Sequence, residues 1–227
     1  MKLTTIRTSR GTRAARAEGD GTLVELPFAD VGALLRDPHW PAAADGPVHE
    51  AMFAERSALV TRPGKVVRVG RDSVRVTRPR LLSGPRDPIV LPQETVAVWW
   101  KTELAVVIGP AGAVAGFSML NEISEIGRLS LGPALVTPDE LPGALRPRLT
   151  LCSFVDGRSV RNSAPAELDF GALVADLALR LPLDPGDVVA VARDEVPLVL
   201  NAGSVLEVEI DELGFHENAL AGVRSRV

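Results

Sequence analysis

The segment of residues 96–108 constrains the fold of this chain most. It is the longest candidate strand in the sequence, and its second half, from Leu104 to Ile108, is entirely apolar. Such a run, rich in β-branched residues and free of proline and glycine, favours an extended strand over a loop. Lys101 and Glu103 lie two positions apart in the first half, so an extended chain turns both side chains to the same face. We therefore predict a long strand with a charged pair on one face.

Strand signals dominate the rest of the chain as well. Short apolar segments flank the Asp20-Gly21 turn and predict a hairpin near the N-terminus, and residues 154–158 indicate another hairpin. Further candidate strands are residues 65–69, 188–191, 198–200 and 205–210. Apolar side chains recur at helical spacing in residues 166–181, and Asp30 is placed to cap a shorter helix. The pattern predicts an α+β, mainly β fold.

Composition argues against several classes of function. The net charge is -4 and no basic surface is clustered in the way that nucleic-acid binding requires. The single cysteine, Cys152, excludes an intramolecular disulfide. The N-terminal segment has no apolar core of a signal peptide, and no stretch approaches the length of a membrane span. We expect a cytoplasmic protein that binds a small molecule and neither nucleic acid nor a membrane.

A series of segments resembles the catalytic domain of the fumarylacetoacetate hydrolase family. In chain order these are residues 62–70, 84–92, 100–109, 116–124, 131–141, 185–189 and 202–205. Each segment alone is a weak signal, whereas their order over residues 58–220 is specific. The N-terminal hairpin also resembles the small leading domain of that family. The resemblance therefore implies a small domain and connection over residues 1–57, and a catalytic domain over residues 58–227.

The resemblance implies a β-rich roll that commonly forms homodimers. Members of this family bind a divalent cation, usually magnesium, through two glutamates on one strand and an aspartate from a later segment. They cleave or rearrange carbon–carbon bonds next to paired carbonyl groups. Their reactions include hydrolysis of β-diketones, decarboxylation of oxaloacetate-like acids and isomerisation of enols.

This chain departs from the family pattern at the metal site. Lys101 stands at the first glutamate position, Glu103 keeps the second, and Glu122 replaces the aspartate. The lid with its His–Glu pair is absent, and the Gly-Thr-Pro substrate loop reads Ala192-Arg193-Asp194. A deletion between residues 127 and 131 removes the position where the family usually carries a substrate lysine. The resemblance therefore does not carry hydrolysis over to this chain.

Charge balance indicates what replaces the metal. Three carboxylates with a divalent cation sum to -1, and Lys101 with Glu103 and Glu122 gives the same sum without a metal. At ~4 Å and an effective dielectric of ~20, a divalent ion beside an ammonium costs about 8 kcal/mol before relaxation. We expect no cofactor. If magnesium binds, its ligands are Glu103 and Glu122.

The same residues suggest a chemical role. The Lys101 ammonium is placed to stabilise an enolate oxygen, and Glu103 or Glu122 to act as general base on an acidic C–H. We expect substrate contacts from Arg193, Asn121, Arg68 and Arg71. The arginines at positions 68–86 either line the entrance for an anionic substrate or form a solvated ribbon. His39, His49 and His216 show no metal-ligand spacing, and we expect them at the surface.

Three hypotheses remain open from the sequence. The first is an enzyme of specialised metabolism that acts on a 1,3-dicarbonyl or enolisable oxo-acid or polyketide-like substrate by isomerisation, cyclisation, decarboxylation or C–C cleavage. The second is a non-catalytic relative, retained as a binding or assembly partner, in which Lys101 and the two glutamates fill a dead site. The third is a conventional magnesium-dependent hydrolase that uses Glu103, Glu122 and another acid such as Asp72.

Overall fold

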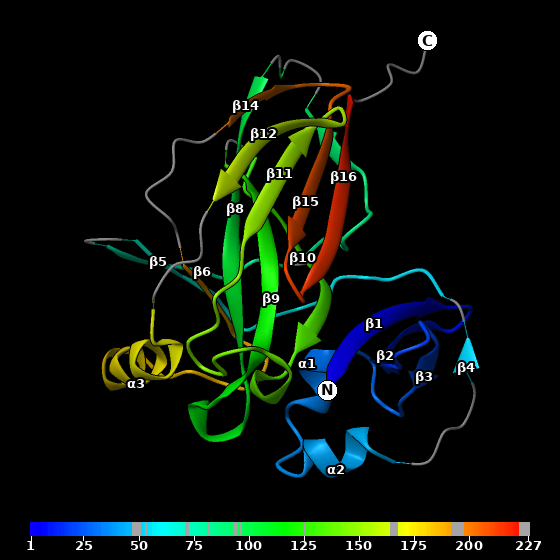
Figure 1. Cartoon of the computed structure of the whole chain (residues 1–227), viewed down its shortest axis with the longest axis vertical. Coiled ribbons are helices and arrows are strands. Elements are labelled where there is room, and N and C mark those ends of the chain that lie inside the picture. The colour runs from blue at the N-terminus through cyan, green and yellow to red at the C-terminus, as the bar shows by residue number, and fades with distance from the viewer. Residues whose placement is uncertain are drawn as a thin grey trace.

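The computed structural model describes residues 1–46, 51–52, 54–70, 73–80, 82–92, 95, 97–124, 126–163, 168–191 and 198–222 (Figure 1). Its strands form two sheets. The large sheet has eleven strands, ordered β4-β3-β2-β1-β10-β9-β8-β13-β5-β6, with β14 paired to β8 as well. The small sheet has the order β12-β11-β15-β16-β7. This architecture confirms the predicted α+β, mainly β fold class.

Each sheet is assembled from segments that are distant from one another in the sequence. The large sheet contains β1 (Lys2–Thr8), β2 (Gly11–Ala17), β3 (Leu23–Glu25), β4 (Ala51–Met52), β5 (Val66–Val69), β6 (Val74–Thr77), β8 (Ala97–Ile108), β9 (Val114–Ile123), β10 (Arg128–Val136), β13 (Val188–Val191) and β14 (Leu198–Asn201). The small sheet contains β7 (Ile89–Leu91), β11 (Leu151–Val155), β12 (Arg158–Ser163), β15 (Val205–Ile210) and β16 (Gly214–Gly222). The helices are α1 (Val31–Leu34), α2 (Trp40–Ala44) and α3 (Phe170–Arg180), with two 3-10 turns, η1 (Pro110–Gly112) and η2 (Pro138–Glu140).

Strand β8 is the long strand that the apolar run predicts, and it organises the large sheet. It pairs with β9 along most of its length on one side. On its other side it pairs first with β14 and then with β13. Residues from Leu104 to Ile108 are buried whichever way they point, so both faces of the strand are covered. The apolar sequence of this half follows from that burial.

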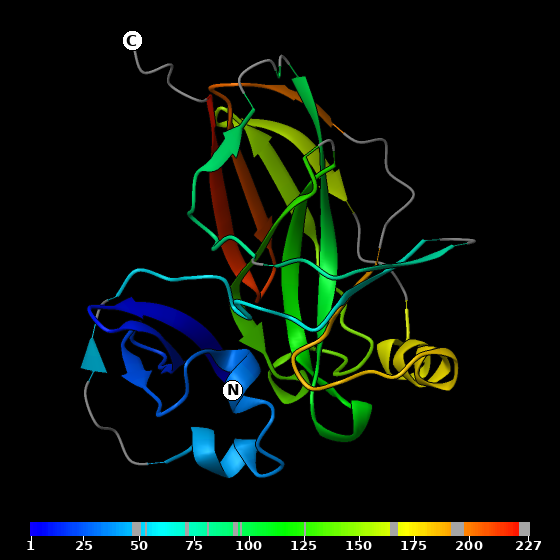
Figure 2. The ribbon, with the colours of Figure 1, turned by 180° about the vertical axis from the view of Figure 1, so that it is seen from behind.

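Two cores lie on opposite faces of β8. Even-numbered residues such as Val106 face the small sheet, where Phe117 of β9 packs edge-to-face on Phe170 of α3 with ring centroids 5.2 Å apart. Odd-numbered residues such as Val107 share a core with the N-terminal segments, including Leu34 of α1. Figure 2 shows these N-terminal elements, in blue, beside the large sheet. The face on which a charged residue of β8 lies therefore depends on whether its residue number is even or odd.

The N-terminal strands are continuous with the large sheet. Lys2 and Leu3 of β1 pair with Val136 and Leu135 of β10, and Thr5 Oγ1 donates to the Leu59 carbonyl at 2.6 Å. The hairpin around Asp20-Gly21 is present as β2 and β3. The division of the chain after residue 57 into two domains stays a prediction.

Local sequence signals explain the helix starts. The Asp30 carboxylate accepts from the Ala33 N–H at 2.7 Å and caps α1, as the sequence predicts. Asp169 caps α3 in the same way through Ala172, and Leu181 lies at its C-terminal end. No helix in the described part of the chain has the length and apolar character needed to cross a membrane.

We predict that Phe117→Ala destabilises the protein by about 3–5 kcal/mol, because removal of a fully buried ring that anchors α3 leaves a cavity. Urea unfolding measures this change. Val199→Ala, at a position that is 59% exposed, serves as the control and should cost less than about 0.5 kcal/mol. Equal losses in the two variants would contradict the proposed packing of α3 on β9.

Candidate functional site

The structure brings Lys101, Glu103 and Glu122 together on one face of the large sheet. Lys101 and Glu103 lie on the same face of β8, and Lys101 is directly opposite Glu122 of β9 in the strand register. Glu103 is 3% exposed and Glu122 is 8% exposed. The three charged residues that the family resemblance singled out are therefore neighbours, and both glutamates are buried.

Arg68 completes this group and is the cation that contacts both carboxylates. Its Nη1 lies 2.7 Å from Glu122 Oε1, and its Nε lies 3.6 Å from Glu103 Oε2. Arg68 is on β5, so its side chain reaches β8 and β9 across the intervening strand β13. The residues in register with it on β13 and β8 are Ala190 and Ala105, whose small side chains leave room for the guanidinium. We call Arg68, Lys101, Glu103 and Glu122 the charged cluster.

A buried ion pair holds β5 in the position that the charged cluster requires. Asp187, at the start of β13, is fully buried and accepts the Lys65 backbone N–H at 2.9 Å. The Lys65 ammonium lies 2.5 Å from the other oxygen of the same carboxylate. Lys65 directly precedes β5, so this contact fixes the register in which Arg68 lies beside Ala190.

Burial has a clear effect on Glu103. Loss of hydration on burial raises the pKa of the Glu103 carboxyl above its ordinary value. The positive charge of Arg68 opposes this rise, the negative charge of Glu122 adds to it, and the positive charge of Lys101 opposes it. Glu103 Oε2 and Arg68 Nε have no hydrogen-bond partner among the described residues, although both are buried. Glu103 is therefore a strongly desolvated carboxyl whose Oε2 faces Arg68 Nε at 3.6 Å without a hydrogen bond.

Lys101 is the second cation of the charged cluster. It is half-buried, and its charge helps to lower the pKa of Glu103, but it forms no ion pair within the described part of the chain. The replacement of the metal by Lys101 stays a prediction; among the described residues, the cation that contacts both carboxylates is Arg68. Lys101 lies beside the pair with its ammonium uncommitted.

The charged cluster is a poor match for a divalent cation. Two carboxylates and two fixed cations sum to zero, so a divalent ion would leave a charge of +2 in a largely buried place. The ion would also compete with Arg68 for Glu122. Among the described residues, no group of three or more His, Cys, Asp or Glu side chains is arranged to hold a metal.

Asn121, predicted to bind substrate, lies on the opposite face of β9 from Glu122. Its side chain is 1% exposed, its Oδ1 accepts from Thr102 Oγ1 at 2.6 Å, and its Nδ2 donates to Asn218 Oδ1 at 3.4 Å. These contacts place Asn121 between the two sheets and away from the charged cluster. Arg71, Arg193 and Asp72 lie outside the described residues, so their predicted contacts stay predictions.

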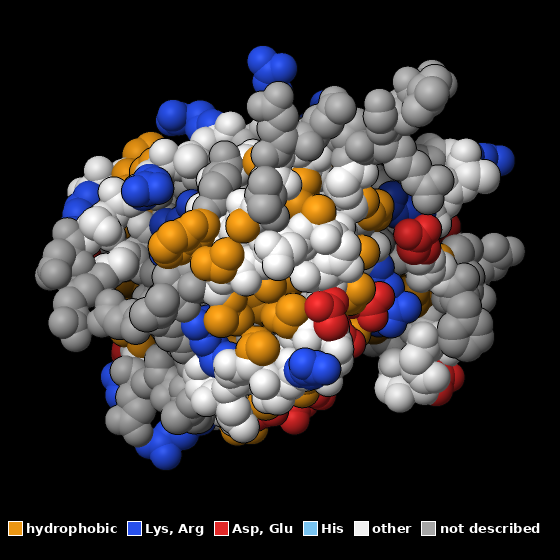
Figure 3. Space-filling view, turned by 90° about the horizontal axis from the view of Figure 1, so that it is seen from above, with side chains coloured by type: hydrophobic (Ala, Val, Ile, Leu, Met, Phe, Trp, Pro, Cys, Tyr) orange, Lys and Arg blue, Asp and Glu red, His pale blue; other side chains and the backbone are white. Residues whose placement is uncertain are grey.

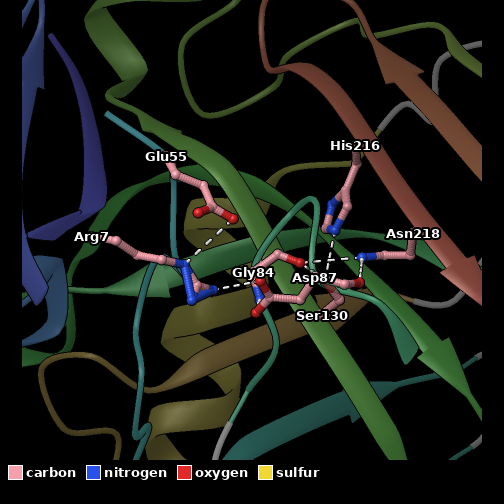
Figure 4. A network of polar contacts seen from close by, with 7 residues as sticks. All are labelled: Arg7, Glu55, Gly84, Asp87, Ser130, His216 and Asn218. Carbon is pink, nitrogen blue, oxygen red and sulfur yellow. Dashed lines mark hydrogen bonds and ion pairs between the residues drawn. The ribbon is translucent and has the colours of Figure 1, made fainter. Parts of the chain in front are cut away.

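The expectation of a surface position for His216 is wrong. His216 is fully buried on β16, where its Nε2 lies 2.7 Å from Ser130 Oγ (Figure 4). Ser130 Oγ also lies 2.7 Å from the Gly84 carbonyl, which Asn218 Nδ2 contacts as well. Burial lowers the pKa of His216 to about 3, so the ring is neutral. These residues tie the segment around Gly84 to β10 and β16.

We predict that Arg68→Met destabilises the protein by about 3–5 kcal/mol, because it leaves two buried carboxylates without their cation. Arg75→Met is the matched control, since Arg75 faces Arg68 across the β5–β6 pair but is exposed. Chemical unfolding of both variants tests this expectation. A small and equal effect would show that the charged cluster contributes little to stability.

The raised pKa of Glu103 predicts a pH-dependent stability. Between its ordinary value of 4.5 and its raised value, the folded protein binds more protons than the unfolded chain, so stability falls as pH rises through that window. Glu103→Gln should therefore gain stability relative to the wild type as pH increases from acidic to neutral. Unfolding curves across that range, with the exposed Glu209→Gln as control, should show this gain only for position 103.

Comparisons with known proteins bear on this site. A mitochondrial oxaloacetate tautomerase of Bos taurus is 31% identical over 210 aligned residues, covering 69% of this chain and 66% of the relative. Fumarylacetoacetate hydrolase domain-containing protein 2 of Pongo abelii is 30% identical with the same coverage. The chain thus spans just under two thirds of the length of these curated relatives. No family profile matches it.

Solved structures show the same fold at lower identity. 5-Carboxymethyl-2-hydroxymuconate delta-isomerase from Mycobacterium smegmatis has a TM-score of 0.78 at 21% identity, over 98% of this chain and 100% of that one. Maleylpyruvate hydrolase from Sphingobium sp. SYK-6, in complex with manganese(II) and pyruvate, has a TM-score of 0.79 at 19% identity, over 98% and 99%. Sequence similarity and fold agree: the chain belongs to the fumarylacetoacetate hydrolase family.

Proposed function

We propose that this protein is an enzyme that interconverts the enol and keto forms of an oxo acid or a related 1,3-dicarbonyl compound, with fixed cations in place of a divalent metal. The observation that carries this proposal is Glu103, a buried carboxyl with a raised pKa whose Oε2 lies 3.6 Å from Arg68 Nε without a hydrogen bond and which also feels the charge of Lys101. Curated relatives of the chain are oxaloacetate tautomerases. Tautomerisation needs a proton carrier and charge stabilisation, and the charged cluster contains both.

The proposed reaction moves one proton. Ionised Glu103 accepts the proton from the carbon next to the carbonyl, and the C–H electron pair becomes the enolate double bond. The negative charge that develops on the carbonyl oxygen is stabilised by the Lys101 ammonium. Glu103 then returns its proton to the enolate oxygen, which gives the enol, so that no atom is gained or lost. The raised pKa favours this role, because it makes the carboxylate a stronger base near neutral pH.

Arg68 and Glu122 are positioning residues in this proposal. Arg68 contacts Glu122 at 2.7 Å, whereas its approach to Glu103 Oε2 is longer, at 3.6 Å, and makes no hydrogen bond. Lys101 is the cation that remains for substrate, because it has no ion pair with a described residue. In this proposal, Arg68 does not bind the substrate directly.

Exposed apolar side chains beside Lys101 support an organic substrate. Trp99 lies on the same face of β8 as Lys101 and directly opposite Val199 of β14, and these side chains are 47% and 59% exposed. Hydrophobic side chains gather on the end of the molecule where β14 lies (Figure 3). We infer that the substrate carries an apolar part beside its enolisable group.

Tautomerisation, cyclisation and decarboxylation all require enolate stabilisation, and none of them requires a positioned water molecule. Hydrolysis also needs a positioned water molecule, and the sequence lacks the His–Glu pair of the family lid. The proposed reaction is therefore an isomerisation rather than hydrolytic C–C cleavage. We also propose that the protein acts in specialised metabolism, that it is located in the cytoplasm and that it forms a homodimer.

A second candidate is a non-catalytic protein in which the charged cluster fills a former active site. The ion pair between Arg68 and Glu122 favours it, because it neutralises both residues within the fold. Five cavities of about 430–610 Å³ in the described part of the chain are lined by other residues. Under this hypothesis the wild-type protein does not accelerate tautomerisation at all.

Lys101→Met tests the proposed function. Oxaloacetate tautomerisation, followed by ultraviolet absorbance in chelator-treated buffer, should lose about 10²–10³-fold in kcat because one stabiliser of the enolate oxygen is removed. Lys2→Met, which changes an exposed lysine on β1, should retain full activity. Wild-type rates equal to those of buffer would favour the non-catalytic candidate.

Calorimetry with magnesium or manganese tests whether the charged cluster works without a divalent metal. The wild type should show no micromolar binding, because two cations occupy the cluster. The double variant Arg68→Met/Lys101→Glu should gain binding, since it leaves three carboxylates and no cation. Micromolar affinity in the wild type would contradict the proposal and support a conventional magnesium enzyme.

A further inference from the structure

A cavity of about 500 Å³ lies between the segment that precedes β5 and the turn around Arg86. Its lining consists of Ala54, Glu55, Arg56, Pro85, Arg86, Pro133 and Phe215. The cavity shares no residue with the charged cluster, so a ligand bound in it would be independent of the proposed tautomerisation.

Two arginines line the cavity, and Glu55 is the one carboxylate in its lining. Neither Arg56 nor Arg86 forms a hydrogen bond or an ion pair through its side chain with a residue in the described ranges. Burial lowers the pKa of Arg56, and the charge of Arg86 lowers it further. The two charges are thus close enough to repel each other, and Arg56 is half-buried whereas Arg86 is exposed.

The acids next to these arginines in the sequence, Glu55 and Asp87, contact Arg7 of β1 (Figure 4). Asp87 accepts a hydrogen bond from Arg7 Nη2 through one oxygen and from the Gly84 N–H at 2.7 Å through the other. Glu55, the one carboxylate in the cavity lining, has its Oε1 3.8 Å from Arg7 Nε. Arg7 therefore neutralises part of the negative charge of Glu55 and Asp87, so these carboxylates do not fully balance Arg56 and Arg86. The cavity keeps a net positive charge.

Two like charges in a partly desolvated cavity cost free energy unless an anion joins them. Paired guanidiniums match the geometry of a carboxylate or a phosphate, because each presents parallel N–H donors. The remaining wall favours a carboxylate with an apolar body, since Phe215 is 36% exposed and the neighbouring lining residues are Pro85 and Pro133. A free phosphate would leave this apolar surface uncovered.

We propose that this cavity binds a small organic carboxylate, with the carboxylate between Arg56 and Arg86 and the apolar body against Phe215 and the two prolines. The site is separate from the charged cluster and lies between the segment that precedes β5, the turn around Arg86 and Phe215 of β16. A ligand bound there would contact that segment and the small sheet.

Isothermal titration with benzoate, and separately with inorganic phosphate, tests the proposal on the full chain. Benzoate should bind the wild type, and its affinity should fall at least tenfold in Arg56→Gln and in Arg86→Gln. Phe215→Ala should weaken benzoate binding several-fold. Arg36→Gln, which removes an exposed arginine elsewhere, is the matched control and should bind as the wild type does.

Thermal unfolding gives a second readout that does not need a ligand. Removing one of two repelling cations should raise the melting temperature of ligand-free Arg86→Gln above that of Arg36→Gln. Absence of benzoate binding in the wild type would overturn the proposal. Phosphate binding that equals or exceeds benzoate binding, with no effect of Phe215→Ala, would overturn the assignment to an organic carboxylate. Association of two chains that weakens in Arg56→Gln, without benzoate binding, would also overturn it in favour of a self-contact.

Discussion

The contact of Arg68 with Glu122 and Glu103 is the interaction on which the centre of this structure depends. Each of these groups lies in a place where water is largely excluded, so each charge requires a partner inside the protein. The partner arrives from β5, two strands away from β8, over the alanines at positions 190 and 105. A larger residue at either position would separate the guanidinium from the carboxylates. Strand order, small side chains and charge balance are thus parts of one arrangement.

The same arrangement defines the chemistry that the site could support. A divalent metal neutralises several carboxylates at once and retains an open coordination position for substrate. A guanidinium neutralises them through fixed hydrogen bonds and has no such position, so substrate contacts must come from another group. Lys101 is the neighbouring cation that remains uncommitted within the described residues. In the proposed mechanism, charge neutralisation and enolate stabilisation are therefore divided between Arg68 and Lys101.

The sequence predicts much of the fold and part of the site. The apolar run of β8, the Asp20-Gly21 turn and the Asp30 cap are local signals, and the structure contains the elements that they predict. The proximity of Lys101 to Glu103 follows from the two-residue period of a strand. The ion pairs of Arg68 do not follow from local signals, because they depend on a parallel pairing of β5 with β13, more than a hundred residues later. No single-sequence pattern encodes that strand order.

The positions of two further residues have simpler explanations. Asn121 directly precedes Glu122, so on a strand its side chain must point to the other face. His216 alternates with Asn218 and the buried Leu220 on β16, and that alternation indicates an inward position.

Proton transfer by the charged cluster without a divalent metal can be measured directly. The experiment is exchange of the C3 protons of oxaloacetate with deuterated solvent, followed by proton NMR in chelator-treated buffer. We predict exchange that is faster than in buffer, unchanged by added magnesium and lost in Glu103→Gln. Exchange that appears only after magnesium is added, or that persists in Glu103→Gln, would contradict this mechanism.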